Sequence, residues 1–464
     1  MNRILNSTLS LLLIASLLTS CQNTPKAKKE ADAKHEKSCC SHSMHLDWTR
    51  NANIYEVNIR QYTPEGTINA FAEHMPRLKE MGVDILWLMP VYPISEKNRK
   101  GSMGSYYAVA DYQAVNPEFG TMADLQNLVK KAHEMGMYVI LDWVANHTGW
   151  DNVIMEEHKD WYTQNEKGEI VIPEGTDWSD TADLNYENED MRKYMTESLK
   201  FWITNADIDG FRCDVAGMVP TEFWEKARKE LDAVKPVFML AEDGGHELLE
   251  NAFDMGYGWD FHHIMNDVAK GEKNANDMEA FFAKVDTIYP ADSYIMNFIT
   301  NHDENSWNGT VKERMGEGGK TFAVLTFTMP GMPLIYSGQE AGMDKRLKFF
   351  EKDEIDWSNM ELASFYKELI ALKKNNKALQ NGVKGGKLVR IPSDKNEEIF
   401  AFSREAEGNK VVVILNLSKN AVKATLELGA NEGNYACYKD GNKHDLAAKL
   451  EVELKPWEYR VYVK

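Results

Sequence analysis

Cysteine is scarce in this chain, with five residues among 464. Cys213 falls in an apolar run typical of a buried strand, and Cys437 lies far from it in the sequence. An exported domain stapled by disulfides carries more cysteines at closer spacing. The cysteine content therefore excludes a disulfide framework.

No segment has the length and apolar character of a membrane-spanning helix. The most hydrophobic stretch, residues 4–18, follows Arg3 and is interrupted by serine and threonine, as in a secretory signal. The string Leu18-Thr19-Ser20-Cys21 resembles the lipobox of bacterial lipoproteins. We therefore expect residues 1–20 to be a signal peptide and Cys21 to carry the lipid chains that anchor the protein to a membrane.

Residues 21–47 lack apolar periodicity and are rich in lysine, glutamate, serine and histidine, a composition typical of a flexible tether. A cysteine and histidine tract at residues 35–45 could hold a soft metal, but its spacing matches no structural zinc site. Residues 22–29 lack the acidic run that resembles a surface-export signal. We expect attachment to the bacterial outer membrane, on its periplasmic side.

Basic clusters are missing outside the tether, and the formal net charge is −19. Nucleic-acid binding depends on lysine and arginine side chains that neutralise phosphates. The charge pattern therefore argues against a nucleic-acid partner, and we expect a monomer.

What the chain does have is a regular alternation of apolar runs and amphipathic stretches between residues 54 and 374, as repeated β/α units require. The alternation breaks over residues 148–189, which are rich in Gly, Asp, Trp and Pro. The pattern predicts an α/β fold, a (β/α)8 TIM barrel over residues 48–376, with a short insertion at 148–189. The sixth barrel strand is expected at residues 259–264.

The pattern changes again after Gly385. Short runs of alternating apolar residues follow, separated by turn residues, as in an antiparallel β-sandwich. We expect residues 377–464 to form such a C-terminal domain.

Four of the apolar runs end in charged or polar side chains, at residues 142–147, 210–216, 241–243 and 301–303. Short buried strands that deliver charged residues at their carboxyl ends are typical of the active face of a parallel barrel. Because residues two apart on a strand share a face, Arg212 and Asp214 should point the same way. A single acidic residue after a strand usually caps a helix, but four such ends predict a functional site.

The four segments resemble the first four sequence motifs of the α-amylase family of retaining glycoside hydrolases (glycoside hydrolase family 13). Further segments are similar to other motifs of that family and keep its order, namely residues 104–112 with 116–121, residues 182–185 and residues 331–340. The resemblance covers residues 48–464. It implies hydrolysis of α-glycosidic bonds without a cofactor for the chemistry, and it identifies the insertion as domain B, a wall of the cleft.

Retaining hydrolysis takes two carboxyl groups about 5 Å apart, one a nucleophile and the other an acid that later acts as a base. The resemblance implies that Asp214 is the nucleophile, Glu242 the acid and base, and Asp303 a third carboxylate that holds the distorted sugar. Arg212 on the strand face of Asp214 should lower the pKa of that carboxyl. Partial burial and neighbouring anions should raise the pKa of Glu242.

The remaining site residues follow from the same resemblance. His147 and His302 would bind sugar hydroxyls together with Arg212, and Tyr107 would stack on a sugar face. Asp142 would orient Arg212. Further candidate sugar platforms are Trp143, Trp150 and Trp178.

A structural calcium ion often lies between the barrel and domain B in this family. Asn146 and Asp183 match two of its ligand positions, and both offer the oxygen ligands that calcium prefers. The resemblance therefore implies a possible structural Ca²⁺ held by these residues.

Substrate preference is indicated by departures from the family pattern. Exo-acting glucosidases have an aspartate where this chain has Gly104, and the small residues at 101–105 should leave the cleft open. We therefore expect endo-acting cleavage of α-1,4 bonds in starch- or glycogen-derived chains. Val215 instead resembles α-1,6-acting and neopullulanase-like members. The alternatives are an α-glucosidase, oligo-1,6-glucosidase, neopullulanase or transglycosylase on the same scaffold, and, in another class, an inert glycan-binding lipoprotein.

Overall fold

A computed structural model describes residues 45–464 of the chain. The predicted signal peptide, the lipidation site Cys21 and most of the cysteine and histidine tract lie outside the described residues. None of the helices within residues 45–464 is long and apolar enough to span a bilayer. Cys213 and Cys437 are both free thiols.

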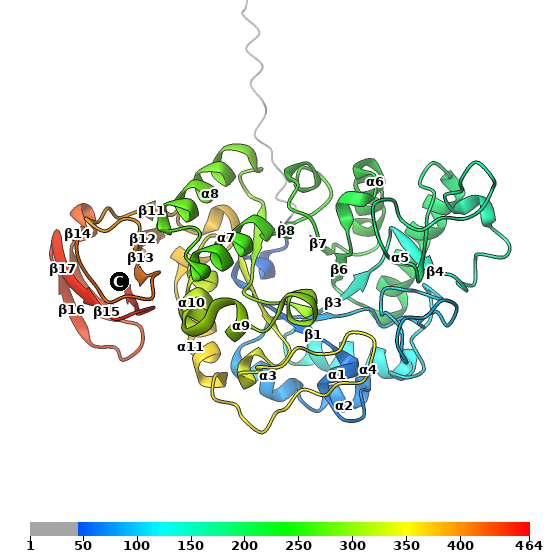
Figure 1. The fold of residues 1–464 in the computed structure, drawn as a ribbon, viewed down its shortest axis with the longest axis horizontal. Coiled ribbons are helices and arrows are strands. Elements are labelled where there is room, and N and C mark those ends of the chain that lie inside the picture. The colour runs from blue at the N-terminus through cyan, green and yellow to red at the C-terminus, as the bar shows by residue number, and fades with distance from the viewer. Residues whose placement is uncertain (1–44) are drawn as a thin grey trace, which may run out of the picture. The chain divides into compact units, whose positions relative to one another are not determined.

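Eight parallel strands close into a barrel, which confirms the predicted fold class (Figure 1). Around the barrel the strands follow the order β1, β10, β9, β8, β7, β6, β3, β2. Their bounds are β1 (Ile54–Val57), β2 (Ile85–Leu88), β3 (Tyr138–Trp143), β6 (Gly210–Cys213), β7 (Phe238–Ala241), β8 (Met255–Tyr257), β9 (Tyr294–Asn297) and β10 (Met332–Tyr336).

Helices surround the barrel and bury apolar side chains against it. They are α1 (Ile59–Tyr62), α2 (Ile68–Ala72), α3 (Met75–Met81), α4 (Met122–Glu134), α5 (Glu189–Ala206), α6 (Thr221–Asp232), α7 (Trp259–Lys270), α8 (Ala275–Ile288), α9 (Val311–Met315), α10 (Gly319–Thr328) and α11 (Ala363–Asn375). Helix α4 shows how the sequence fixes such an element. Thr121 and Asp124 form a capping box at its start, and Leu125, Leu128 and Val129 face the core at helical spacing.

The predicted position of the sixth barrel strand is wrong. Residues 259–264 belong to α7, and the strand is β8, which lies just before them and has only three residues. Gly256 and Gly258 interrupt the apolar run there. The residues that follow lie on a helix, whose buried side chains Phe261, His262 and Met265 keep helical spacing.

Alternate residues of each strand face opposite layers, and this decides which side chains can reach the site. On β1, Ile54 packs in the barrel interior, while Tyr55 and Val57 pack between the barrel and the helices. Glu56 therefore faces inward, and its side chain is fully buried. On β6, Phe211 and Cys213 likewise face the helices, so Arg212 faces inward, as predicted.

The chain leaves the barrel between β3 and α5 and forms a small two-stranded antiparallel sheet. Its strands are β4 (His147–Gly149) and β5 (Thr181–Asp183), and His147 is the register partner of Asp183. The sheet begins at the carboxyl end of β3, so it lies at the same edge of the barrel as the predicted site.

The C-terminal domain is all-β, as predicted. Strands β14 (Val422–Glu427) and β17 (Lys449–Leu454) pair with each other. A second sheet has the order β11 (Val389–Arg390), β12 (Ile399–Ala406), β13 (Asn409–Asn416), β18 (Tyr459–Val463), β15 (Gly433–Cys437), β16 (Lys443–Leu446). Apolar side chains from both sheets share one core.

Arg404 ties this domain to the barrel. Its buried guanidinium donates to the carbonyl oxygens of Thr328 and Met329 at the end of α10, and to those of Gln380 and Gly386 in the connection between the domains. In Figure 1 the orange and red strands lie beside α8, α10 and α11.

Candidate active site

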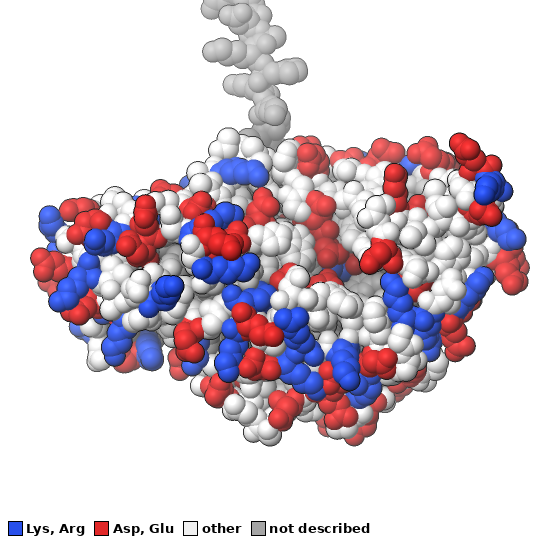
Figure 2. Space-filling view, viewed as in Figure 1, with Lys and Arg blue, Asp and Glu red and all other residues white. Residues whose placement is uncertain are grey.

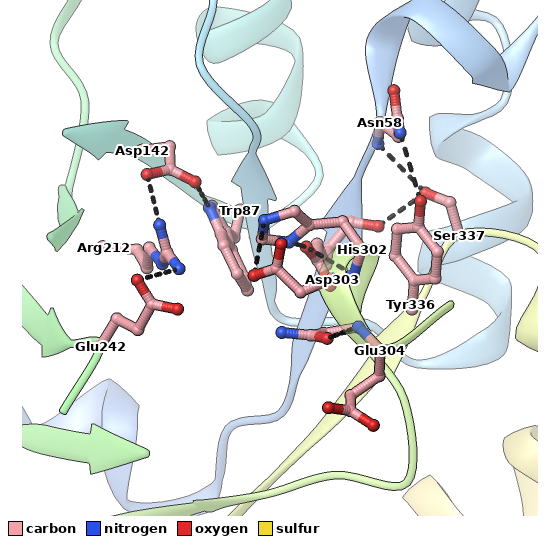
Figure 3. Close-up of polar contacts among 12 residues, drawn as sticks. Asn58, Trp87, Asp142, Arg212, Glu242, His302, Asp303, Glu304, Tyr336 and Ser337 are labelled. Carbon is pink, nitrogen blue, oxygen red and sulfur yellow. Dashed lines mark hydrogen bonds and ion pairs between the residues drawn. The ribbon is translucent and has the colours of Figure 1, made fainter. Parts of the chain in front are cut away.

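The guanidinium of Arg212 lies at the centre of the site and contacts three carboxylates, two of which, Asp142 and Glu242, are labelled in Figure 3. Its Nη1 lies 2.9 Å from Asp142 Oδ1 and 2.9 Å from Asp214 Oδ1, and its Nη2 lies 2.8 Å from Glu242 Oε2. The Arg212 side chain is fully buried. Strand register explains the arrangement, because Asp142 on β3 pairs directly with Arg212 on β6. The three predicted motif residues are thus brought together around one cation.

Asp142 lies below the site and serves as a shared acceptor. It is fully buried, and it accepts hydrogen bonds from Trp87 Nε1 at 3.1 Å and from the Tyr107 hydroxyl at 3.0 Å, in addition to Arg212. Tyr257 adds a further contact, its hydroxyl accepting from Arg212 Nε at 3.2 Å. These fixed partners hold the guanidinium in one orientation.

Val215 has a strained backbone conformation that directs its N–H toward Glu242. Its φ and ψ are 37° and 47°, in the left-handed region, which a β-branched residue adopts at a cost of about 1–3 kcal/mol. In this conformation the Val215 N–H donates to Glu242 Oε2 at 2.8 Å. The strained residue therefore links the chain next to Asp214 to the second carboxylate.

Burial raises the pKa of the Asp214 carboxyl well above its usual range, the neighbouring Glu242 raises it further, and Arg212 only partly offsets both. The expected lowering of the Asp214 pKa is therefore wrong in its net direction. Burial also raises the pKa of Glu242, as expected, with a contribution from Asp303. Burial and the neighbouring carboxylates therefore favour the protonated form within the Asp214 and Glu242 pair.

His302 joins the second half of the site. Its Nδ1 lies 2.5 Å from Glu56 Oε1, and its Nε2 lies 2.7 Å from the Tyr107 hydroxyl and 3.2 Å from Asp303 Oδ2. Burial alone would lower the pKa of His302, but Asp303 and Glu56 outweigh it and raise the pKa to about 9. At neutral pH both ring nitrogens therefore donate, one to Glu56 and the other toward Tyr107 and Asp303.

A cavity of about 620 Å³ opens over these side chains. Its lining includes seven of the predicted residues, namely Tyr107, His147, Trp178, Asp214, Glu242, His302 and Asp303, while Arg212 and Asp142 lie beneath them. Figure 2 shows a hollow on the face turned to the viewer, and basic and acidic side chains are interspersed over that face. The volume suits a short stretch of oligosaccharide better than a single small ion.

Domain B forms one wall of the cavity. Trp178 lies 5.3 Å from the ring of His147, centroid to centroid, and both line the space. Burial lowers the pKa of His147 to about 3, so this imidazole is neutral. Lys100, from the loop after β2, pairs with Asp180 at 3.1 Å and joins that loop to domain B. Of the other candidate platforms, Trp143 is fully buried and is a core residue.

The small residues at 101–105 do not leave the cleft open, and this part of the sequence argument is wrong. A Cβ on Gly101 would come within 2.5 Å of the Cβ of Phe350, so the glycine allows close packing. Met103 N–H donates to Phe350 O at 3.0 Å, and Arg60 donates to both Gly104 O and Phe349 O. A second loop, carrying Phe349 and Phe350, therefore closes this side of the cavity.

The predicted calcium ligands, Asn146 and Asp183, lie side by side, but they supply fewer oxygen ligands than calcium prefers. Asn146 O accepts from Leu184 N at 3.1 Å, which places it beside Asp183. A hydrogen bond from the Thr163 side chain already engages the Asp183 carboxylate. Within residues 45–464 no group of three or more acidic, histidine or cysteine side chains converges on a metal-sized space. Calcium prefers six to eight oxygens, so its presence stays a prediction from the resemblance.

Sequence reasoning missed several residues of the site. The sequence does carry a signal for Glu56, because it is a charged residue inside the apolar strand β1. A charged side chain is rarely buried without a partner. Tyr257 and Trp87 carry no local signal, because a tyrosine or tryptophan on a strand is usually core. Phe349 lies in a loop and Trp307 in a short π-helix, both outside the motifs, so only the fold places them at the cavity.

Models of known families match most of the chain. The catalytic domain of α-amylases matches residues 31–364, and the C-terminal all-β domain of α-amylases matches residues 391–461. Together they cover the barrel, with its insertion, and the C-terminal sheets.

Curated relatives are similar over most of this chain. It is 28% identical to a cyclomaltodextrinase of Thermoanaerobacter pseudethanolicus, covering 80% of this chain and 71% of that protein. It is also 28% identical to a maltogenic α-amylase of Bacillus acidopullulyticus, with coverages of 85% and 70%. An α-amylase of Haloarcula japonica is 26% identical, with 83% of this chain matched. The chain spans 58% of the length of that last relative.

Solved structures of α-amylases superpose on this chain over most of its length. A maltogenic α-amylase of Thermotoga neapolitana superposes with a TM-score of 0.82 at 28% identity, over 90% of this chain and 99% of that one. An α-amylase of Lactobacillus plantarum superposes with a TM-score of 0.80 at 29% identity, with the same coverages.

Replacing Glu56 with glutamine should move the alkaline limb of the activity profile to lower pH. Without this carboxylate the charged form of His302 loses a partner, so its pKa falls from about 9. We expect kcat/KM at neutral pH to fall about tenfold, since a hydrogen bond to a charged group is worth about 1.5 kcal/mol. The folded pKa lies above the unfolded value, so the stability that His302 adds is complete below about pH 6.5 and is lost as pH rises toward 9.

The measurements are the pH dependence of kcat/KM and of the melting temperature for wild type and Glu56→Gln. Glu80→Gln is the matched control, because Glu80 is exposed on α3 and pairs only with Lys367 at the surface. An unshifted alkaline limb in Glu56→Gln would show that Glu56 does not govern His302.

Proposed function

This chain belongs to the α-amylase family, and we propose that it hydrolyses α-1,4-glucosidic bonds in starch- or glycogen-derived chains with retention of configuration. The observation that carries the proposal is the pair of carboxylates, Asp214 and Glu242, held by adjacent nitrogens of the Arg212 guanidinium at 2.9 and 2.8 Å. Both border the same cavity. Two neighbouring carboxyl groups are the arrangement that retaining hydrolysis uses.

In the first step a carboxylate oxygen of Asp214 forms a bond to the anomeric carbon, while the bond from that carbon to the leaving oxygen breaks. Glu242 gives its proton to the leaving oxygen. In the second step Glu242 takes a proton from water, whose oxygen attacks the same carbon and releases Asp214. Burial raises the pKa of Glu242, which favours the protonated form that the first step needs, and Arg212 stabilises the carboxylate charge that moves between the two groups.

The positive charge on the sugar in the transition state needs further stabilisation. Asp303 is the carboxylate of the site that remains partly exposed, at 33% for its side chain, and it faces the cavity. His302, as a cation bonded to Glu56, is fixed to donate toward sugar hydroxyls. Tyr107 is bonded to both His302 and Asp142, so its ring is held in place as a platform for a sugar face.

Internal cleavage is the second part of the proposal. The position at which exo-acting glucosidases have an aspartate is Gly104, and no side chain of residues 101–105 carries an acidic group. Aromatic rings line the cavity on two sides, with Trp178 from domain B and Trp307 from the loop after β9. A chain can therefore make contacts on both sides of the carboxylates, as an endo-acting enzyme needs.

Asp214→Asn and Glu242→Gln should each reduce kcat on maltoheptaose at least about a thousandfold, which corresponds to about 4 kcal/mol. Each variant removes one chemical step and leaves the volume of the side chain unchanged. Circular dichroism and melting temperature would show that both are folded. Glu250→Gln is the control, because Glu250 is an exposed carboxylate in the segment between β7 and β8. Near-wild-type turnover by a folded Asp214→Asn would reject the assignment.

Reducing-end-blocked maltoheptaose should give mixed products of maltose to maltotetraose size at early times, because an internal bond can occupy the site. Proton NMR of the first product should show the α-anomer, as retention requires. Pullulan and isomaltose, tested in parallel, measure α-1,6 activity and distinguish the neopullulanase and oligo-1,6-glucosidase alternatives. Glucose as the sole early product would indicate an α-glucosidase instead.

The third part of the proposal is that lipid on Cys21 attaches the protein to the periplasmic side of the outer membrane. The described chain begins at the end of the barrel opposite the site. His45 stacks on Tyr294, the first residue of β9, at 4.0 Å, and its Nδ1 lies 3.2 Å from Asp254, just before β8.

Cys21→Ser should abolish labelling with a palmitate analogue and move the protein from the membrane fraction to the soluble fraction, or leave it unprocessed. Asp214→Asn with Cys21 intact is the control, since it should stay in the membrane fraction. Protease added to whole cells should leave the intact protein undigested, and its degradation would contradict the periplasmic assignment.

A further inference from the structure

Trp307 is a large apolar side chain that the fold leaves exposed. It is 51% accessible, although tryptophan is usually among the most buried residues. It lies in a short π-helix, Glu304–Asn308, that directly follows Asp303. Such helical irregularities occur frequently at functional sites.

The segment that carries Trp307 is held firmly from both sides. Asn305 Nδ2 donates to Lys345 O at 2.9 Å, and Asn305 Oδ1 accepts from Leu347 N at 2.9 Å. Below it, Glu304 lies 3.0 Å from His262 Nε2. The exposed ring is therefore set on a fixed support, as a binding platform should be.

A row of rings leads from Trp307 to the reaction centre. The ring centroids of Trp307 and Phe349 lie 5.2 Å apart, those of Phe349 and Tyr107 6.2 Å apart, and those of Tyr107 and His302 5.5 Å apart. The last two pairs are nearly parallel, at 18° and 17°. Exposure rises along the row from the buried His302 to Trp307.

The position of these rings indicates which kind of ligand the exposed Trp307 ring binds. Trp307, Phe349 and Phe350 line the cavity that also contains Asp214 and Glu242. A ligand on these rings is therefore continuous with the reacting bond, which favours part of the substrate chain over a partner protein. Sugars suit such a surface because their C–H faces pack on aromatic rings while their hydroxyls stay in water.

We propose that Trp307, supported by Phe349 and Phe350, binds a glucosyl unit of the substrate chain beyond the unit that stacks on Tyr107. The proposal rests on the proposed α-glucan hydrolase function and extends it to chain length. Binding energy gained on this remote unit helps to hold the reacting bond against the carboxylates. The enzyme should therefore prefer longer maltooligosaccharides.

The test compares kcat/KM for maltoheptaose and maltotriose in wild type, Trp307→Ala and Trp307→Phe. For Trp307→Ala we expect kcat/KM to fall about tenfold on maltoheptaose and by no more than about twofold on maltotriose, because the shorter chain has fewer productive positions that reach the platform. Trp307→Phe keeps an aromatic face and should retain at least about half of the wild-type preference. Val389→Ala, which changes a side chain 56% exposed in the C-terminal domain, is the control.

Equal losses on both substrates, or no loss on either, would overturn the proposal. Melting temperatures of all variants separate an unfolded variant from a weakened subsite. If the wild type hydrolyses neither substrate, the proposed function fails. Calorimetric titration of maltoheptaose into wild type and Trp307→Ala then tests binding at the Trp307 subsite independently of turnover. Equal affinities in that titration would reject it.

Discussion

The site depends on one buried cation shared by three carboxylates. Arg212 has no water to solvate it, so its charge is stabilised by Asp142, Asp214 and Glu242. Burial raises the pKa values of Asp214 and Glu242, and neighbouring carboxylates raise them further. The ion cluster thus fixes the geometry of the two proposed reacting groups, and their burial favours the protonated form that the proposed chemistry needs.

The barrel makes this cluster possible because strand register sets distances that loops cannot. Asp142 and Arg212 are direct partners on β3 and β6, and Leu240, two residues before Glu242, is the partner of Arg212 on β7. This geometry is accompanied by backbone strain at Val215, whose left-handed conformation directs its N–H toward Glu242. Local strain of this kind persists only where the surrounding structure fixes it.

A second ion pair, Glu56 with His302, governs the opposite wall and shapes substrate recognition. It gives His302 a positive charge at neutral pH and fixes Tyr107 through a short hydrogen bond. From Tyr107 the aromatic surface extends through Phe349 to Trp307. The loop that brings Phe349 there is braced against residues 101–104, so the same contacts that narrow the cavity also build its outer platform.

The sequence by itself determined the barrel, the all-β C-terminal domain and the residues at the strand ends, because hydrophobic period and motif order are local properties of the chain. The sixth strand was misplaced since a strand of three residues, one of them Gly256, carries too little period to detect. Only the tertiary structure decided the contacts between distant segments. Glu56 and His302 are 246 residues apart, and the pKa of Asp214 depends on burial that no motif encodes. Gly101 permits close packing by the loop that follows β10, the last barrel strand, and this loop closes one side of the cleft. The glycine is visible in the sequence, but the distant side chain that packs against it is not.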